Sequence, residues 1–344
     1  MNIRLKWKHL SSRPIHQIGK NEYMEVRKIN HYNRKVVKNM LIGLSILIAV
    51  AILALLFIAY IYQPKEDRNY KSNYLKKVAS NYLEMDHYSA HYMKSGTGSP
   101  VILIHGGGTW LYSYRENTPY ISNYFTTYAV DMPGHGYTKV LLDKPKYDLN
   151  MYCSFLLEFI ERQNLKKVIL VGNSWGGGWA LYFAQKHPDM VEKLVLIDSS
   201  GLALHDVIEW EMFKYPVIGE AASKFINTST VKDGLEKVFY NKDKVNYEMI
   251  KEIKVPLTFK NNRKAQYLAE RNLNWKVVMN HLSEMKIPTL IIWGKNDKYL
   301  DYNYAYQFHK KIKNSELLLI DNCGHVAHED CPDVVNKAIV DFLH

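Results

Sequence analysis

The chain has 344 residues, of which 47% are hydrophobic and 23% charged, a composition that excludes a disordered tail, a collagen and a mini-protein. Its formal net charge is +11, but residues 1–39 hold ten basic and two acidic side chains and so carry +8 of that charge. The rest of the chain carries only +3, which is typical of an ordinary protein surface. The basic excess therefore gives no indication of a nucleic-acid partner.

Residues 40–62 form a stretch of 23 residues without a charged side chain. As a helix this stretch would extend roughly 34 Å, enough to cross a hydrocarbon core of about 30 Å. We interpret it as an uncleaved signal anchor, because a cleavable signal peptide has a short charged region and an apolar region of about 7 to 15 residues. Basic flanks stay in the cytoplasm, so we expect a single-pass cell-membrane protein whose chain beyond Gln63 is extracytoplasmic. A soluble enzyme whose apolar segment is removed is the alternative.

A polar, tyrosine-rich segment follows the apolar stretch, at residues 63–86. Tyr70, Tyr74, Val78 and Tyr82 recur at every fourth position, which is typical of one face of a helix. The spacing therefore predicts a helical stalk.

The rest of the chain alternates short apolar runs with helical stretches. Six runs have the length and composition of buried strands: 101–105, 127–130, 167–171, 193–198, 289–293 and 316–320. Because several are apolar on both faces, they predict a mainly parallel sheet covered by helices on both sides, which is a doubly wound α/β domain. Between Ser200 and Ile287 no comparable strand occurs, and the aromatic-rich helices expected there predict a cap that lines an apolar pocket.

These patterns divide the chain into six predicted segments. They are a basic cytoplasmic leader (1–39), a transmembrane signal anchor (40–62), a stalk (63–86), the first part of the core (87–200), the helical cap (201–286) and the second part of the core (287–344).

The strongest chemical signal is the segment Gly172-Asn-Ser174-Trp-Gly176, which comes directly after a predicted strand and directly before a predicted helix. A serine on such a tight turn has a strained backbone that lifts its Oγ above the edge of the sheet. The glycines on either side keep room for neighbouring backbones. Ser174 is therefore the predicted nucleophile.

A serine nucleophile needs a base and a group that orients the base. Asp297 follows the strand at 289–293, and His325 follows the strand at 316–320, so both lie at the carboxyl end of a predicted strand. We predict a triad of Ser174, Asp297 and His325, with Asp301 as the alternative carboxylate.

A fourth part of such a site stabilises the oxyanion of the transition state. The glycines of His105-Gly-Gly-Gly108 can direct backbone N–H groups toward the nucleophile, and we assign the oxyanion hole to the N–H groups of Gly107 and Trp175. We expect His105 to be structural, and residues 131–136 to form a turn that shapes the floor of the site.

Together these segments resemble the α/β-hydrolase superfamily. The resemblance covers residues 87–344 through HGGG, DMPGHG, GNSWGG, WGKND and CGHVAHEDCP, in that order along the chain. It implies an α/β-hydrolase fold and no metal or organic cofactor. Serine instead of aspartate at position 174 argues against a dehalogenase or an epoxide hydrolase.

We therefore expect a membrane-anchored serine hydrolase that cleaves carboxylic ester or related acyl bonds of a small, lipophilic substrate. A carbon–carbon bond hydrolase and an enzyme resembling proline iminopeptidases are alternatives of the same fold, and a non-catalytic ligand-binding receptor is an alternative of another class. The sequence fixes neither the oligomeric state nor the substrate. Of three cysteines, Cys323 and Cys331 are the nearer pair, and their spacing is compatible with a disulfide or with free thiols.

Overall fold

The computed structural model describes residues 19–203 and 208–344. The first 18 residues of the predicted leader and four residues of the predicted cap, 204–207, lie outside the described residues. The chain divides into two compact units, Met1–Phe57 and Ile58–His344.

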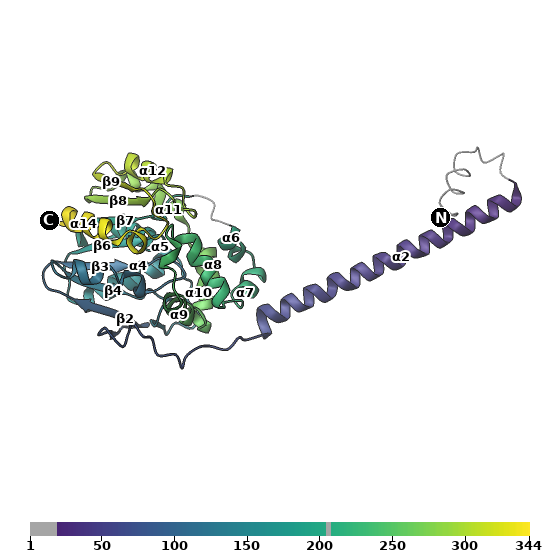
Figure 1. Ribbon diagram of the computed structural model, residues 1–344, viewed down its shortest axis with the longest axis horizontal. Helices are drawn as coiled ribbons and strands as arrows, with labels where there is room; N and C mark the ends of the chain where they lie inside the picture. The colour runs from purple at the N-terminus through teal and green to yellow at the C-terminus, as the bar shows by residue number, and fades with distance from the viewer. Residues whose placement is uncertain (1–18, 204–207) are drawn as a thin grey trace. The chain divides into compact units, whose positions relative to one another are not determined.

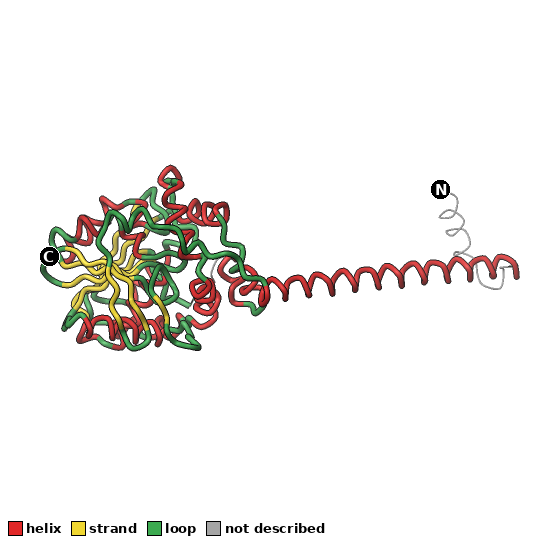
Figure 2. The backbone as a smooth tube through the Cα atoms, turned by 90° about the horizontal axis from the view of Figure 1, so that it is seen from below, coloured by secondary structure: helices red, strands yellow, loops and turns green. Residues whose placement is uncertain are grey.

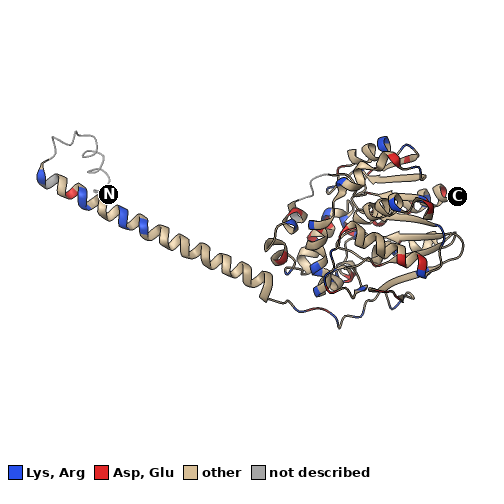
Figure 3. Cartoon of the chain, turned by 180° about the vertical axis from the view of Figure 1, so that it is seen from behind, with Lys and Arg blue, Asp and Glu red and all other residues tan. Residues whose placement is uncertain are grey.

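The first unit is dominated by one long helix, α2 (Lys20–Leu56), which continues into a π-helical turn, η2 (Phe57–Ile61). Within the described residues, one helical stretch is long and apolar enough to cross a membrane, Tyr23–Ile61, with a mean hydropathy of 3.1. Figure 3 shows the basic residues of α2 in its N-terminal part and no charged residue beyond them. The helix thus begins before the predicted span and includes part of the leader.

The second unit is built on a nine-stranded sheet (Figure 1). Its strands are β1 (Asn81–Glu84), β2 (Tyr88–Ser95), β3 (Pro100–Ile104), β4 (Thr126–Val130), β5 (Lys139–Val140), β6 (Val168–Asn173), β7 (Val191–Ile197), β8 (Thr289–Gly294) and β9 (Ser315–Ile320). Their order is β1-β2-β4-β3-β6-β7-β8-β9, and β5 pairs with β2. The six strands from β4 to β9 along this order are parallel and are the six that the sequence predicts; β1, β2 and β5 pair antiparallel.

Helices cover both faces of the sheet, as Figure 2 shows with the strands in yellow between red helices. Ile102 and Ile104 of β3 face the core formed with α4 (Leu149–Arg162), α5 (Trp175–Lys186) and α12 (Asn303–Lys311). Val101 and Leu103 face the opposite core, formed with α3 (Thr118–Ile121), α13 (Ala327–Asp330) and α14 (Pro332–Leu343). Both alternating sets are fully buried, which explains why this strand is apolar throughout.

The segment between β7 and β8 is helical. It contains α6 (Ile208–Lys214), α7 (Ile218–Ala222), α8 (Thr228–Val238), α9 (Tyr247–Leu257), α10 (Lys260–Asn272) and α11 (Trp275–Asn280). Short 3₁₀ turns complete the unit at η3 (Leu111–Tyr114), η4 (Pro188–Met190), η5 (Lys242–Lys244) and η6 (Leu282–Glu284). We refer to residues 201–286 as the cap.

The helical stalk predicted for residues 63–86 is wrong. Residues 63–80, which we call the strap, contain turns but no helix, and Asn81–Glu84 form the edge strand β1. The tyrosines instead make tertiary contacts. The Tyr74 ring packs edge-on against Tyr112, with centroids 5.1 Å apart, and the Tyr70 hydroxyl donates a hydrogen bond to Glu252. The folded domain therefore begins at the strap.

One buried carboxylate, that of Glu252 in α9, makes several of the contacts between the strap and the cap. Its Oε1 accepts hydrogen bonds from the Tyr70 hydroxyl (3.0 Å) and from the backbone N–H groups of Asn73 (2.7 Å) and Tyr74 (3.3 Å). Nearby, the Lys254 ammonium lies 2.9 Å from the Asp67 carboxylate. Polar contacts thus join the cap to the strap, and neither segment could satisfy these groups without the other.

Replacing Glu252 should release the strap. We expect Glu252→Ala to lower the free energy of unfolding by about 2–3 kcal/mol, because three donors lose a charged and buried acceptor. Thermal unfolding would measure the loss, and trypsin should then cleave at Lys71, Lys76 and Lys77 of the strap. Glu248→Ala, an exposed glutamate one turn earlier in α9, is the control. Equal stability and equal cleavage of both variants would contradict the assignment.

Candidate active site

Ser174 lies on a strained turn between β6 and α5. Its backbone has φ 51° and ψ −121°, a region that L-residues rarely adopt. Backbone hydrogen bonds to the end of β7 and the loop after it hold the turn in place. The Ser174 N–H donates to the Ile197 carbonyl (3.0 Å), and the Ser174 carbonyl accepts from the Ser200 N–H (2.9 Å). The side chain that the sequence identifies as the nucleophile is therefore fixed at the carboxyl edge of the sheet.

The helix behind Ser174 begins with glycines because its neighbours leave no room for side chains. A Cβ atom added to Gly176 would lie 2.2 Å from the Ile104 carbonyl oxygen of β3. A Cβ atom on Gly178 would lie 2.3 Å from the Trp275 ring of α11. The start of α5 is thus packed between the sheet on one side and the cap on the other.

Asp297 and His325 meet, as the sequence predicts. The His325 Nδ1 donates to Asp297 Oδ2 at 2.8 Å, and both side chains are almost completely buried. Asp297 Oδ1 accepts from the N–H groups of Tyr299 (2.7 Å) and Leu300 (2.9 Å), which fixes the carboxylate. The alternative carboxylate, Asp301, instead accepts from the Asn303 N–H at the start of α12 and is exposed.

The serine turn and the histidine loop are connected through Asn173. Its Nδ2 donates to the carbonyls of Ile197 and His325, at 3.1 Å each. Across the same edge, a Cβ atom added to Gly294 would lie 2.3 Å from the Gly324 carbonyl oxygen, so the loops that carry the acid and the base are in backbone contact. All three predicted residues therefore lie at one edge of the sheet.

Asp198 is a second buried carboxylate at this edge, to which the sequence analysis assigned no role. Its Oδ1 accepts from the Gly294 N–H (2.8 Å), and its Oδ2 accepts from the Ala327 N–H (3.0 Å). Burial, and then the nearby charge of Asp297, raises the pKa of Asp198. Its position directly after a buried parallel strand, like that of Asp297, is the signal that could have found it.

The glycine-rich loop after β3 lies against the serine turn. A Cβ atom on Gly106 would lie 3.1 Å from the Ser174 Cβ, and one on Gly107 would lie 2.6 Å from the Trp175 ring. Only glycine therefore allows this loop to approach so closely. The His105 ring is occupied by backbone groups, because Nδ1 donates to the Gly106 carbonyl (2.7 Å) and Nε2 accepts from the Met132 N–H (3.0 Å).

The predicted floor of the site is organised by Asp131, which is fully buried. Its carboxylate accepts from the backbone N–H groups of Leu111 and Tyr137, at 2.8 Å each, and from the His91 Nδ1 at 2.7 Å. These bonds hold the turn at 131–136 and η3 in place beneath the glycine-rich loop.

The cap contributes an uncharged wall beside this loop. Trp210 of α6 packs on Trp175, with ring centroids 4.9 Å apart, and Gln266 of α10 contacts the His135 Nε2 at 3.4 Å. Burial, and then the neighbouring His105, lowers the pKa of His135 to about 3, so this histidine is neutral at physiological pH. Other cap aromatics that the sequence assigns to a pocket are exposed instead: Tyr215, Phe225, Tyr240 and Tyr247.

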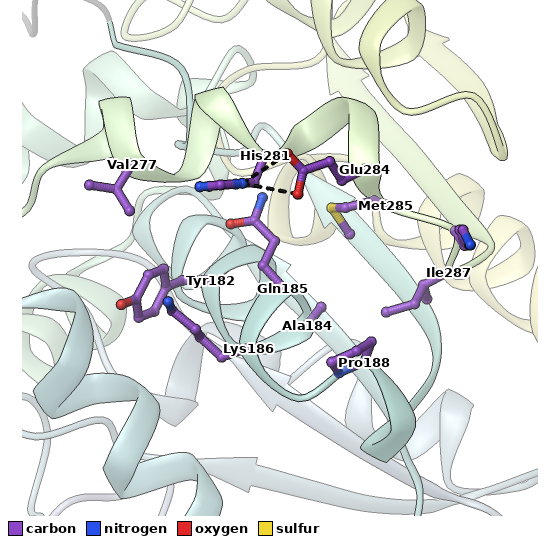
Figure 4. Close-up of a pocket in the computed structure, with 11 residues that line it drawn as sticks. Tyr182, Ala184, Gln185, Lys186, Pro188, Val277, His281, Glu284, Met285 and Ile287 are labelled. Atoms are coloured by element: carbon purple, nitrogen blue, oxygen red, sulfur yellow. Dashed lines mark hydrogen bonds and ion pairs between the residues drawn. The ribbon is translucent and has the colours of Figure 1, made fainter.

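A surface cleft of about 480 Å³ lies elsewhere, at the carboxyl end of α5 (Figure 4). Its lining includes Tyr182, Lys186 and the pair His281 and Glu284, which are 3.0 Å apart. Tyr182 is eight residues beyond Ser174, or roughly 12 Å along the helix. This cleft is therefore separate from the predicted site.

One trio among the described residues has ligand atoms close enough to share a metal ion: Cys323, Asp330 and Cys331, whose atoms lie within 4.8 Å of one another. Zinc in structural sites takes four ligands, and the Asp330 Oδ2 already accepts from the N–H groups of Gly324 (2.8 Å) and Tyr240 (2.7 Å). We therefore assign no metal to the trio. The two cysteines are free thiols in this structure.

His328 is a buried histidine whose ring nitrogens have no hydrogen-bond partner in the described part of the chain. Its ring packs on Tyr114, with centroids 4.7 Å apart, and Glu329 Oε1 lies 4.0 Å from Nε2, too far for a hydrogen bond. Burial, and then the charge of Arg115, lowers the pKa of His328 to about 3. The folded protein therefore keeps this ring neutral.

The pH dependence of stability should reflect this ring. Between about pH 6.5 and pH 3 the unfolded chain takes up a proton at His328 that the folded chain refuses, so stability falls as the pH falls, by up to about 1.4 kcal/mol per pH unit. We expect His328→Phe to weaken the decline of the melting temperature between pH 7 and pH 5. His87→Phe, at an exposed histidine, should leave the decline unchanged. Parallel curves for the wild type and His328→Phe would refute this explanation.

Comparisons with known proteins identify the family to which this fold belongs. The family model described as alpha/beta hydrolase fold matches residues 99–218 and 226–332. The chain is 32% identical over 269 residues to 2-hydroxy-6-oxo-6-(2'-aminophenyl)hexa-2,4-dienoic acid hydrolase of Metapseudomonas resinovorans, covering 73% of this chain and 86% of that protein. It is 25% identical over 272 residues to epoxide hydrolase 3 of Xenopus tropicalis, covering 74% of each chain.

Among solved structures, naproxen esterase from Bacillus subtilis has the same fold, with a TM-score of 0.66 at 18% identity, and the match covers 78% of this chain and 94% of that one. Fold, family match and relatives agree, and the chain is a member of the alpha/beta hydrolase family.

Proposed function

We propose that the protein is a membrane-anchored serine hydrolase that cleaves carboxylic ester or related acyl bonds through an acyl-enzyme on Ser174. The observation that carries the proposal is the 2.8 Å hydrogen bond between His325 and Asp297 at the edge where the strained Ser174 turn lies. A carboxylate that holds one imidazole nitrogen leaves the other, Nε2, to exchange protons with a serine hydroxyl.

In the proposed reaction, His325 Nε2 takes the proton of the Ser174 hydroxyl while Oγ attacks the carbonyl carbon of the substrate. Asp297 keeps the Nδ1 proton in place and stabilises the imidazolium. The backbone N–H groups of Gly107 and Trp175 stabilise the tetrahedral oxyanion, and each such donor contributes roughly 3–4 kcal/mol. The imidazolium then protonates the leaving alcohol, and a water molecule, activated by the same base, hydrolyses the acyl-enzyme.

The wall beside the glycine-rich loop favours an uncharged acyl group. Trp175, Trp210 and Gln266 carry no charge, and His135 is held neutral by its low pKa. A carboxylate placed against these side chains would lose its hydration without gaining an ionic partner from them. This composition supports a neutral, partly aromatic or aliphatic ester.

A carbon–carbon bond hydrolase is the second candidate, and the 32% identity to the dienoic acid hydrolase of Metapseudomonas resinovorans favours it. The same serine, base and oxyanion hole can act on a ketone instead of an ester. Such a dienoic acid is an anion at neutral pH, and the uncharged wall argues against it. We do not propose epoxide hydrolysis, because Ser174 stands where that chemistry uses an aspartate.

Ser174 should be the residue that reacts with a fluorophosphonate probe. We expect the wild type, extracted from membranes, to be labelled and Ser174→Ala to be unlabelled, with a loss of turnover on the order of 10⁶-fold. Ser200→Ala is the matched control, because this serine adjoins the turn through its backbone. A folded wild type that takes no label would support the ligand-binding receptor instead of the enzyme.

Substrate class separates the two catalytic candidates. We expect kcat/KM for nitrophenyl esters of medium chain length to exceed that for a 2-hydroxy-6-oxo-hexadienoate by at least about tenfold, because the dienoate carboxylate lacks a cationic partner at the wall. Steady-state kinetics on both substrates would measure the ratio. A reversed ratio would favour the carbon–carbon hydrolase, and neither activity should remain in Ser174→Ala.

The proposed location is the cell membrane, with residues 40–62 as a single span and the catalytic domain extracytoplasmic. The length and hydropathy of α2 and the basic residues at its N-terminal end support this orientation. An intact mass of 40.2 kDa for the membrane-bound protein would agree with an uncleaved anchor, and a mass lacking the apolar segment would indicate the soluble alternative.

A further inference from the structure

A small cationic cleft lies outside the predicted active site, between the cap and the residues that end the apolar segment. Its volume is about 180 Å³. The lining residues that matter here are Tyr60, Lys224, Lys260, Arg263, Lys264 and Tyr267. The mechanism proposed above uses none of them.

The cations converge because of helical spacing. Lys260, Arg263, Lys264 and Tyr267 recur at three- and four-residue intervals in α10 and therefore share one face of that helix. Lys224 joins them from the turn after α7. The positive end of the α10 dipole lies at Lys260 and adds to the field.

Arg263 is a buried cation in the lining of this cleft, which is a feature of a specific binding site. Its side chain is only 3% exposed, although a guanidinium is costly to bury, and it donates to the Thr258 carbonyl through Nη1. Among the ion pairs that the described residues form, none includes Arg263, Lys224, Lys260 or Lys264. The cleft therefore holds four cations without a carboxylate bound to any of them as an ion pair.

The neighbouring acids are already engaged. Glu220 lines the cleft, but its two oxygens accept from the Arg271 guanidinium at 2.7 and 2.8 Å. Glu66 faces Arg263, but it accepts from the Lys260 N–H (2.6 Å) and from the Arg68 side chain. Burial, and then the charges of Arg263 and Lys260, lowers the pKa of Lys224, as expected where cations repel one another.

We propose that this cleft binds the phosphate of an anionic phospholipid headgroup. A phosphate offers several oxygens to lysine and arginine donors at once, and it would relieve the repulsion among the four cations. Ala59 and Tyr60, which line the cleft, belong to the last residues of the apolar segment, so the cleft opens where a membrane-spanning chain reaches the headgroups. The choice of a lipid over a free phosphate ester rests on the proposed membrane anchor.

Native mass spectrometry of the full-length protein in neutral detergent would test the proposal with two lipids, phosphatidylglycerol and phosphatidylcholine. Both carry a phosphate, but only the first has a net negative charge. We expect the wild type to retain phosphatidylglycerol at least about tenfold more strongly. Lys224→Gln/Lys260→Gln/Lys264→Gln should lose at least about tenfold of this affinity, because each basic residue near a headgroup adds to binding.

The matched control is Lys232→Gln/Lys242→Gln/Lys276→Gln, which removes the same charge from exposed positions of the cap outside the cleft. It should bind phosphatidylglycerol within about twofold of the wild type. Equal losses in the two triple variants, or equal retention of both lipids by the wild type, would overturn the proposal.

Competition with sn-glycerol 3-phosphate distinguishes the two sources of phosphate. Failure of millimolar glycerol phosphate to displace the lipid would support a headgroup site. Displacement would overturn the lipid assignment and leave a site for a soluble phosphate ester. Fluorophosphonate labelling of Ser174 should be the same in all variants, so a failure of this cleft proposal is distinguishable from a failure of the proposed hydrolase activity.

Discussion

The geometry of the predicted triad depends on one buried carboxylate, that of Asp198. It accepts one N–H from the end of β8 and another from the start of α13, and these elements bracket the loops that carry Asp297 and His325. A buried carboxylate with two backbone donors is expensive to rearrange, because losing either bond would leave a charged or polar group without a partner. The two carboxylate oxygens of Asp198 therefore hold the acid loop and the base loop next to each other. This shared support favours the 2.8 Å bond between Asp297 and His325.

The cap is connected to every part of the domain that bears on function. The Val238 carbonyl at the end of α8 accepts from the His325 N–H at 2.8 Å, so the cap contacts the base loop directly. Glu252 of α9 binds the strap, and α10 provides both Gln266 beside the glycine-rich loop and the cationic face beside Tyr60. A shift of α10 would therefore move both the wall of the site and the cations of the proposed headgroup cleft.

The parallel half of the sheet and the meeting of Asp297 with His325 could be predicted from the sequence because they depend on local patterns. Buried parallel strands are apolar on both faces, and polar residues directly after them lie at one edge. The antiparallel strands escaped prediction because β2 reads YSAHYMKS and β5 has two residues, so neither gives an apolar run.

The strap escaped prediction for a different reason. A four-residue tyrosine repeat is compatible with a helix, and only the tertiary partners Glu252 and Tyr112 show why those side chains recur. The roles of Gln266 and Arg263 could not be predicted either, since a polar residue within a helix acquires its role from what packs against it. Long-range contacts of this kind leave no periodic trace in a single sequence.

The contact of Gly178 with Trp275 has a consequence for how the domain can vary. Three successive glycines, Gly176 to Gly178, make the first turn of α5 a poor helix former, by about 1 kcal/mol per residue relative to alanine. That turn persists because the sheet and the cap enclose it, and Trp275 of the cap is part of the enclosure. The cap is therefore not an independent module: exchanging it for one without a flat ring at this position would expose the glycine-rich turn and loosen the helix that supports the nucleophile.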